Sequence, residues 1–254
     1  MSGFLVDLLA VGAHPDDVEL FCGGTVIRAA DLGHGTGILD LTRGERASHG
    51  TPEERAREAE AAAGVLGVRF RENLGLPDTA LDPASREQLC AVVAALRRLR
   101  PEILLIPWVE ERHPDHEAAG ELLRRAVFYA GVAAFDAGPG PRERFVPRQV
   151  LHYALRYPFV PSFVVDTSAA ATRKAEAIAC HASQVTRRPG EAPTLISARD
   201  AVAALEARDR YYGSMIGASH GEPLRCVATP GLVDVVRHFR DNPFEGAHAF
   251  LPRR

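Results

Sequence analysis

Short apolar runs alternate with stretches of helical periodicity over the first 130 residues. Strands are predicted at Val6–Val11, Thr36–Leu41, Val68–Asn73 and Ile103–Pro107, and helices at about 23–32, 52–66, 83–100 and 116–130. Strands that alternate with helices are typical of a parallel sheet covered by helices on both faces. The pattern therefore predicts an α/β fold with a mostly parallel sheet.

The pattern changes after residue 135. A loop rich in glycine and proline, Asp136–Pro147, precedes two predicted strands, "QVLHYAL" and "SFVVDTS", and two predicted helices, near Ala169–Ala182 and Ala198–Ile216. This half is rich in turns and shows no core of its own. We therefore predict one domain over residues 1–254, with a core at 1–135 and smaller cap and sheet-edge elements at 136–254.

Composition and charge narrow the classes of partner. The 30 basic and 33 acidic residues are interspersed, so no basic patch for nucleic acid or an anionic membrane is visible. No apolar run reaches the roughly 18 residues of a spanning helix, and the N-terminus lacks an export pattern. The four cysteines are isolated, which disfavours disulfides and thiolate zinc sites. We expect a cytoplasmic protein that binds neither nucleic acid nor membrane.

The candidate chemistry lies in two loops. "VGAHPDD", Val11–Asp17, follows the first strand, and "ERHPDHEAAG", Glu111–Gly120, follows the strand that ends at Pro107. Ligands bind beyond the carboxyl ends of parallel strands, so both loops are expected at one edge of the sheet. Imidazole and carboxylate groups without cysteine suit a divalent metal, and catalytic zinc has three protein ligands and an open position. His14 and Asp17 can reach one ion, and His116 can complete the triad.

Neighbouring residues are candidates for the chemistry around that ion. Asp16 would stand beside the metal and take a proton from zinc-activated water. His113 is a candidate acid or oxyanion donor, with Asp115 as its orienting partner. Arg43 and Arg46 follow the second strand at the same sheet edge, where a guanidinium can bind a substrate carboxylate in a bidentate pair.

Two other interpretations of these loops are open. Either loop alone is also consistent with a helix cap or a surface ion pair that binds no metal. A dinucleotide site is disfavoured because His14 and Asp16 replace the glycines that let a pyrophosphate approach, and paired carboxylates would repel it.

The two motifs together carry a family resemblance. "AHPDDVE", Ala13–Glu19, with "HPDH", His113–His116, resembles the paired signature of the PIG-L/LmbE superfamily of zinc-dependent de-N-acetylases, over about residues 5–221. The resemblance implies a Rossmann-like core and hydrolysis of the acetamide of an N-acetylglucosamine derivative. By resemblance, the site residues would be His14, Asp17 and His116 on zinc, Asp16 as general base, His113 with Asp115 as proton donor or oxyanion stabiliser, and Arg55 on the substrate. The mixed nitrogen and oxygen donors also suit another divalent ion such as Fe²⁺.

Finer motifs resemble one branch of that superfamily. "LDLTRGERASHGTPEERAREA" (39–59), "NLGLPD" (73–78) and "EARDRYYGSMIGASHGEP" (206–223) resemble deacetylases of the bacillithiol pathway, which act on N-acetylglucosaminyl-malate. The tyrosine that assists the oxyanion in some members has no clear match. Relatives are often trimers or hexamers, so the resemblance implies a homo-oligomer.

Other assignments stay open at the level of sequence. The substrate could instead be a mycothiol precursor, a chitooligosaccharide or an antibiotic intermediate. A metal-binding relative without catalysis is a further alternative, although the occupied base and acid positions, Asp16 and His113, speak against it.

Overall fold

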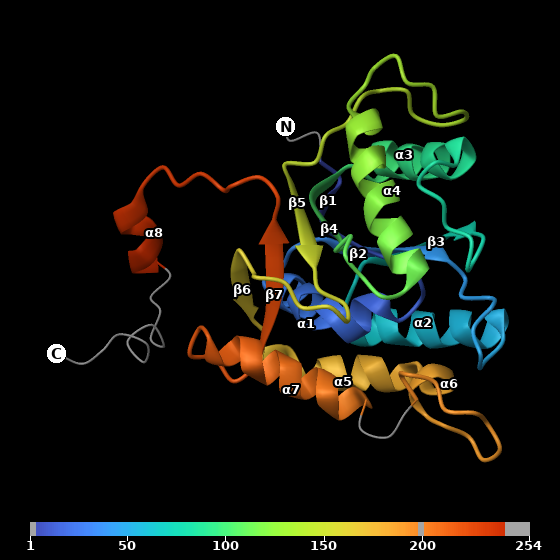
Figure 1. Cartoon of the computed structure of the whole chain (residues 1–254). Helices are drawn as coiled ribbons and strands as arrows, with labels where there is room; N and C mark the ends of the chain where they lie inside the picture. The colour runs from blue at the N-terminus through green and yellow to red at the C-terminus, as the bar shows by residue number, and fades with distance from the viewer. Residues whose placement is uncertain (1–3, 198–200, 242–254) are drawn as a thin grey trace.

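The structure is a computed structural model that describes residues 4–197 and 201–241. One seven-stranded sheet crosses the molecule in the order β3-β2-β1-β4-β5-β7-β6 (Figure 1). The strands are β1 Val6–Gly12, β2 Thr36–Thr42, β3 Phe70–Leu76, β4 Pro101–Pro107, β5 Gln149–Tyr153, β6 Phe163–Asp166 and β7 Gly221–Cys226. The first five are parallel, and β7 is antiparallel to both of its neighbours. The predicted α/β class and mostly parallel sheet are confirmed.

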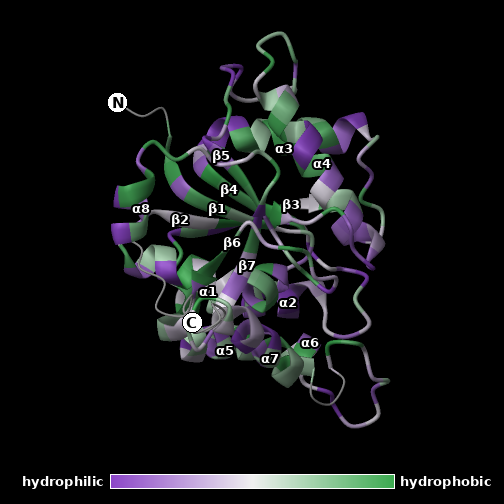
Figure 2. Cartoon of the chain, turned by 60° about the vertical axis from the view of Figure 1, so that its left-hand side comes forward, coloured by the Kyte–Doolittle hydropathy of each residue, from purple (hydrophilic) through white to green (hydrophobic). Residues whose placement is uncertain are grey.

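Helices cover both faces of this sheet (Figure 2). On one face lie α3 Arg86–Leu99 and α4 Pro114–Ala130; on the other lie α1 Asp17–Asp31, α2 Pro52–Leu66, α5 Ala171–Cys180 and α7 Ala201–Ser214. A 3₁₀ turn, Ser168–Ala170, leads into α5, the short α6 Ala182–Val185 follows it, and α8 Val235–Asp241 stands apart from the sheet in Figure 1.

The hydrophobic core has two parts, one on each face of the sheet. In β1, Leu9 and Val11 pack in the cluster that contains α3 and α4, whereas Leu8 and Ala10 pack in the cluster that contains α1 and α5. Successive strand side chains point to opposite faces. An uninterrupted apolar run such as that of β1 can therefore fill both parts of the core.

Helix α1 begins six residues earlier than the helix predicted from Gly23. The backbone leaves helical geometry at Cys22 (φ −146°, ψ 15°), so two helical segments meet there. The Glu222 carboxylate caps the second segment by accepting hydrogen bonds from the N–H groups of Gly24 (2.9 Å) and Thr25 (2.7 Å). A side chain at position 24 would collide with this carboxylate and with Thr167, which requires glycine there. The predicted helix corresponds to this second segment.

Other elements also differ from the sequence prediction. Strand β7 was not predicted because Pro223 lies inside it, and proline is unusual in an inner strand. The helix predicted at 169–182 is interrupted at His181 (φ −82°, ψ 49°), which separates α5 from α6. Helix α3 begins after the cap Ser85, not at Asp82-Pro83. Of the helix predicted from Ala198, residues 198–200 lie outside the described residues.

The one lysine of the chain is buried where several elements meet. The Nζ of Lys174, on α5, lies 2.5 Å from the Asp209 carboxylate of α7 and 2.6 Å from the Glu222 carboxylate of β7. Burial alone would lower the pKa of Lys174, but Glu222 and Asp209 raise it above its usual value. Because Glu222 also caps the second segment of α1, this charged cluster joins the second half of the chain to the first.

The structure also bears on membrane spanning and on the thiols. No helix within the described ranges is long and apolar enough to cross a membrane. All four cysteines are free thiols, as the isolated spacing predicted.

Candidate metal and active site

Strands β1 and β4 are parallel neighbours, so their carboxyl ends bring the two predicted loops together. The β1 end supplies His14, and Asp17 is the first residue of α1. From the β4 side, His113 caps α4, and His116 lies in its first turn. His14, Asp17 and His116 are all buried.

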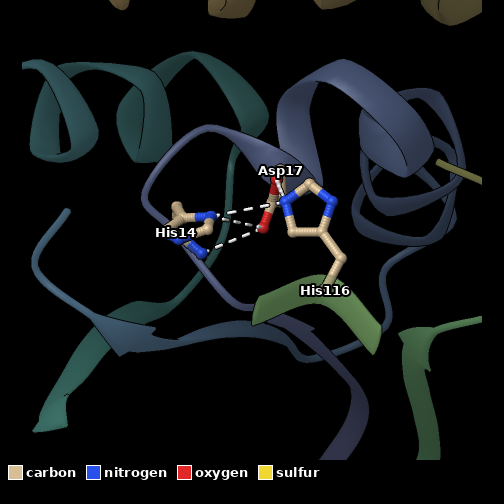
Figure 3. A group of neighbouring side chains, drawn as sticks. All are labelled: His14, Asp17 and His116. Atoms are coloured by element: carbon tan, nitrogen blue, oxygen red, sulfur yellow. Dashed lines mark hydrogen bonds and ion pairs between the residues drawn. The ribbon is translucent and has the colours of Figure 1, made fainter. Parts of the chain in front are cut away.

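The three predicted metal ligands point toward one another (Figure 3). The Nδ1 of His14 lies 3.3 Å from the Nε2 of His116, and this Nε2 lies 3.1 Å from Oδ1 of Asp17. The other Asp17 oxygen lies 3.7 Å from His14 Nδ1. Bond lengths of about 2.0–2.1 Å place two ligands of a tetrahedral zinc ion about 3.3 Å apart. The donor set and its spacing therefore fit a divalent cation.

The second nitrogen of His14 is held by two carboxylates. Its Nε2 lies 3.2 Å from Asp115 and 3.2 Å from Asp78. Burial alone would lower the pKa of His14, but these hydrogen bonds raise it to about 10. A carboxylate on the far nitrogen of a metal-binding histidine fixes the ring and increases its basicity. Asp78 was not among the predicted site residues, and only its tertiary position reveals it.

Asp115 does not take the place predicted for it. Its carboxylate accepts hydrogen bonds from the backbone N–H of Thr79 (2.7 Å) and Leu81 (3.3 Å) in addition to its contact with His14. The Asp115 backbone N–H, not its carboxylate, contacts His113, donating to Nδ1 at 3.2 Å. His113 is the N-cap of α4, and a cap side chain accepts from the N–H two residues later. The Asp115 carboxylate therefore positions His14, and only the backbone N–H of Asp115 orients His113.

The cap geometry also sets the hydrogen-bonding state of His113. Because its Nδ1 accepts the Asp115 N–H, the neutral ring carries its proton on Nε2, where it can donate to a ligand. Burial and the neighbouring His116 lower the pKa of His113, which favours this neutral form at pH 7.

Asp16 stands beside the metal ligands and is paired with the predicted substrate arginine. Its Oδ1 lies 3.3 Å from Nη2 of Arg55, a buried residue that also donates to the Gly44 carbonyl (3.0 Å). Burial raises the pKa of Asp16 above its usual value, against the opposing effect of Arg55. No metal-ligand group of the described residues includes Asp16.

These groups line one end of a cavity of about 260 Å³. Of the three predicted substrate arginines, Arg55 and Arg46 line it. Arg43 does not line this cavity. Its side chain is exposed and lines a different hollow of about 180 Å³, together with Arg71. The cavity has further charged residues that were not predicted: Asp78, Glu111, Arg112 and Arg156.

Loss of one ligand is expected to abolish stable metal binding. His116→Ala leaves two protein donors, so we expect metal content to fall from near one equivalent to below a tenth after dialysis. Elemental analysis of the purified protein measures this. His220→Ala, at a histidine outside the cavity, should keep its metal. Full metal content in His116→Ala would contradict the ligand assignment.

Comparisons with known proteins agree with this arrangement. Residues 9–127 match the family model described as PIG-L, GlcNAc-PI de-N-acetylase. The diacetylchitobiose deacetylase of Thermococcus kodakarensis is 31% identical over 239 residues, which cover 89% of this chain and 84% of that protein. The segment that the family model matches, residues 9–127, contains both histidine motifs.

Solved structures show the same fold. The conserved protein TT1542 from Thermus thermophilus superposes with a TM-score of 0.81 at 41% identity, covering 91% of this chain and 98% of that one. The N,N'-diacetylchitobiose deacetylase of Pyrococcus horikoshii superposes with a TM-score of 0.73 at 27% identity, covering 86% and 82%. By its motifs, its fold and these relatives, the chain belongs to the PIG-L family of de-N-acetylases.

Proposed function

We propose that this protein is a metal-dependent N-deacetylase that hydrolyses the acetamide of an N-acetylglucosamine derivative. The observation that carries the proposal is the buried triad of His14, Asp17 and His116, with Asp16 and His113 beside it at one end of a cavity. Family membership and relatives named as deacetylases support the same reaction class. Zinc is the proposed metal, and the mixed nitrogen and oxygen donors also suit Fe²⁺.

The residues around the triad have distinct proposed roles. A divalent cation on the triad would supply Lewis acidity, which makes water a better nucleophile and polarises the amide carbonyl. Asp16 accepts the proton of the attacking water, and Arg55 holds its carboxylate in place. Asp115 and Asp78 keep the His14 ring in the orientation that presents Nδ1 to the triad.

His113 is the proposed donor to the reacting amide. Its Nε2–H can stabilise the oxyanion. To protonate the leaving amine, the ring would first have to take up the proton that Asp16 removed from water, on Nδ1, which requires release of the Asp115 N–H. This role would replace the tyrosine that some relatives use and that has no clear match here.

For the substrate, we propose N-acetylglucosaminyl-malate, as in bacillithiol biosynthesis. The support is the resemblance of the finer motifs and the presence of several arginines on the cavity wall. A chitooligosaccharide is the second candidate, because a relative that matches 89% of this chain is named as a diacetylchitobiose deacetylase. The cytoplasmic location remains a proposal from the isolated cysteines and the missing export pattern, and the trimer or hexamer remains a proposal from resemblance.

Acetate release from three substrates tests this function. We expect the metal-loaded protein to deacetylate N-acetylglucosaminyl-malate with a kcat/KM at least about tenfold above that for N,N'-diacetylchitobiose or N-acetylglucosamine, a difference of about 1.4 kcal/mol. Equal rates on all three would remove the malate assignment. Release from none of them, at full metal content, would contradict the deacetylase proposal itself.

A further inference from the structure

The guanidinium of Arg156, on the cavity wall, has no ionic partner among the described residues. Arg156 lies in the loop after β5 and is half-buried at the cavity. Throughout residues 4–197 and 201–241, its side chain makes no hydrogen bond or ion pair, and its guanidinium lies 5.8 Å from the centre of the Phe21 ring. A charge removed from water in this way is costly unless a ligand compensates it.

The backbone around Arg156 is fixed by a buried carboxylate. Oε2 of Glu111 accepts the N–H groups of Arg156 (2.6 Å) and Tyr157 (3.2 Å), and its Oε1 accepts the N–H of Arg112 (2.7 Å). Glu111 thereby joins the loop after β4 to the loop after β5. Among the described residues, the guanidinium groups of Arg112 and Arg156 form no ion pair within 4 Å of the Glu111 carboxylate, although its charge favours the charged form of Arg156.

Charged groups of both signs line the cavity. Asp16, Asp78 and Arg55 stand beside the metal triad, and Glu111 binds the backbone of Arg112 and Arg156. Burial, together with repulsion from Arg208 and Arg112, lowers the pKa of Arg156, and the attraction of Glu111 and Asp16 offsets this effect only in part. An anion at this place would relieve that repulsion and offset the burial of the guanidinium.

We propose that Arg156 is a specificity-determining residue that binds an anionic substituent, a carboxylate or a phosphate, on the sugar substrate. The proposal deepens the proposed function and rests on it: the acetamide lies at the metal end, and the anion lies at Arg156. Planar guanidinium groups suit bidentate contacts with both kinds of anion. The enzyme then prefers charged sugars over neutral ones.

Acetate release by Arg156 variants tests the proposal. Arg156→Gln should lower kcat/KM for N-acetylglucosaminyl-malate by about 10- to 100-fold, mainly through KM, because one charge-assisted contact is lost. N-acetylglucosamine 1-phosphate tests phosphate as the anion. N,N'-diacetylchitobiose should change less than about twofold, and Arg156→Lys should recover part of the loss. The matched control is Arg148→Gln, an exposed arginine just before β5, at the opposite edge of the sheet.

Three results would overturn the proposal. Equal losses on charged and neutral sugars would show a general structural role for Arg156. An unchanged KM for both anionic substrates would show that it contacts neither anion. A similar loss in Arg148→Gln would show a nonspecific effect of net charge.

A binding measurement separates this inference from the proposed function. If no sugar is deacetylated, calorimetric titration with glucosaminyl-malate and with glucosamine still tests the arginine. Binding of the malate compound that weakens in Arg156→Gln, with glucosamine unaffected, would support the anion contact although the deacetylase proposal had failed. Equal affinity of wild type and variant for glucosaminyl-malate would overturn it.

Discussion

Replacing Asp16 by asparagine is expected to lower kcat for acetate release by about 10²- to 10⁴-fold, the range for loss of a general acid–base group. Asparagine keeps the shape of the side chain, and its amide oxygen can still accept from Arg55 Nη2. It cannot take a proton from water. Because Asp16 is outside the triad, metal content should stay near that of the wild type. Steady-state kinetics and elemental analysis of the same preparation measure both quantities.

The control for this variant is Asp136→Asn, an exposed aspartate in a distant loop, which should keep full activity. Loss of metal together with activity in Asp16→Asn would identify Asp16 as a ligand. Retention of more than about a tenth of the wild-type kcat would show that another group accepts the proton.

The largest expected effect on stability comes from Lys174→Met. The substitution leaves the carboxylates of Asp209 and Glu222 buried without their shared cation. Removing one partner of a buried ion pair costs about 3–5 kcal/mol, and we expect the free energy of unfolding to fall by that amount. Urea denaturation followed by circular dichroism measures it.

Two further variants serve as comparisons for the stability loss in Lys174→Met. Asp209→Asn should cost less than Lys174→Met, because Lys174 keeps its contact with Glu222. Arg148→Gln, which breaks an exposed pair with Glu102, should change stability by less than about 1 kcal/mol. A loss below about 1 kcal/mol in Lys174→Met would show that the cluster does not hold the two halves of the chain together.

The sequence was sufficient for the fold class and for the position of the site. A buried strand such as β1 can be predicted from its own run of apolar residues. The alternation of such strands with helices then predicts that the strands of the sheet are parallel. The two histidine motifs then had to meet, since each directly follows a strand and parallel neighbours end at one edge. Each histidine motif places its chemical groups within a few consecutive residues, so the motif can be recognised from the sequence alone.

Contacts between loops were not predictable in this way. Asp78, Glu111 and Arg156 come from three separate loops. Asp78 ends the motif "NLGLPD" and Glu111 begins the loop of the second histidine motif, but nothing in the sequence around Arg156 indicates that it shares their cavity. The sequence paired Asp115 with His113, and in the structure this pairing is made by the backbone N–H of Asp115, whereas its carboxylate contacts His14. Arg43 follows the same strand as Arg46, yet it lines a different hollow.

Chemical modification of the buried Lys174 can measure how often the folded protein opens locally. An acylating reagent directed at lysine amines finds no exposed target among the side chains of the folded protein, since Lys174 is the one lysine and is enclosed by Asp209 and Glu222. Modification at this residue requires its Nζ to leave the carboxylates of Asp209 on α7 and Glu222 on β7. The rate of acylation, followed by mass spectrometry, would therefore measure how often that contact breaks under native conditions.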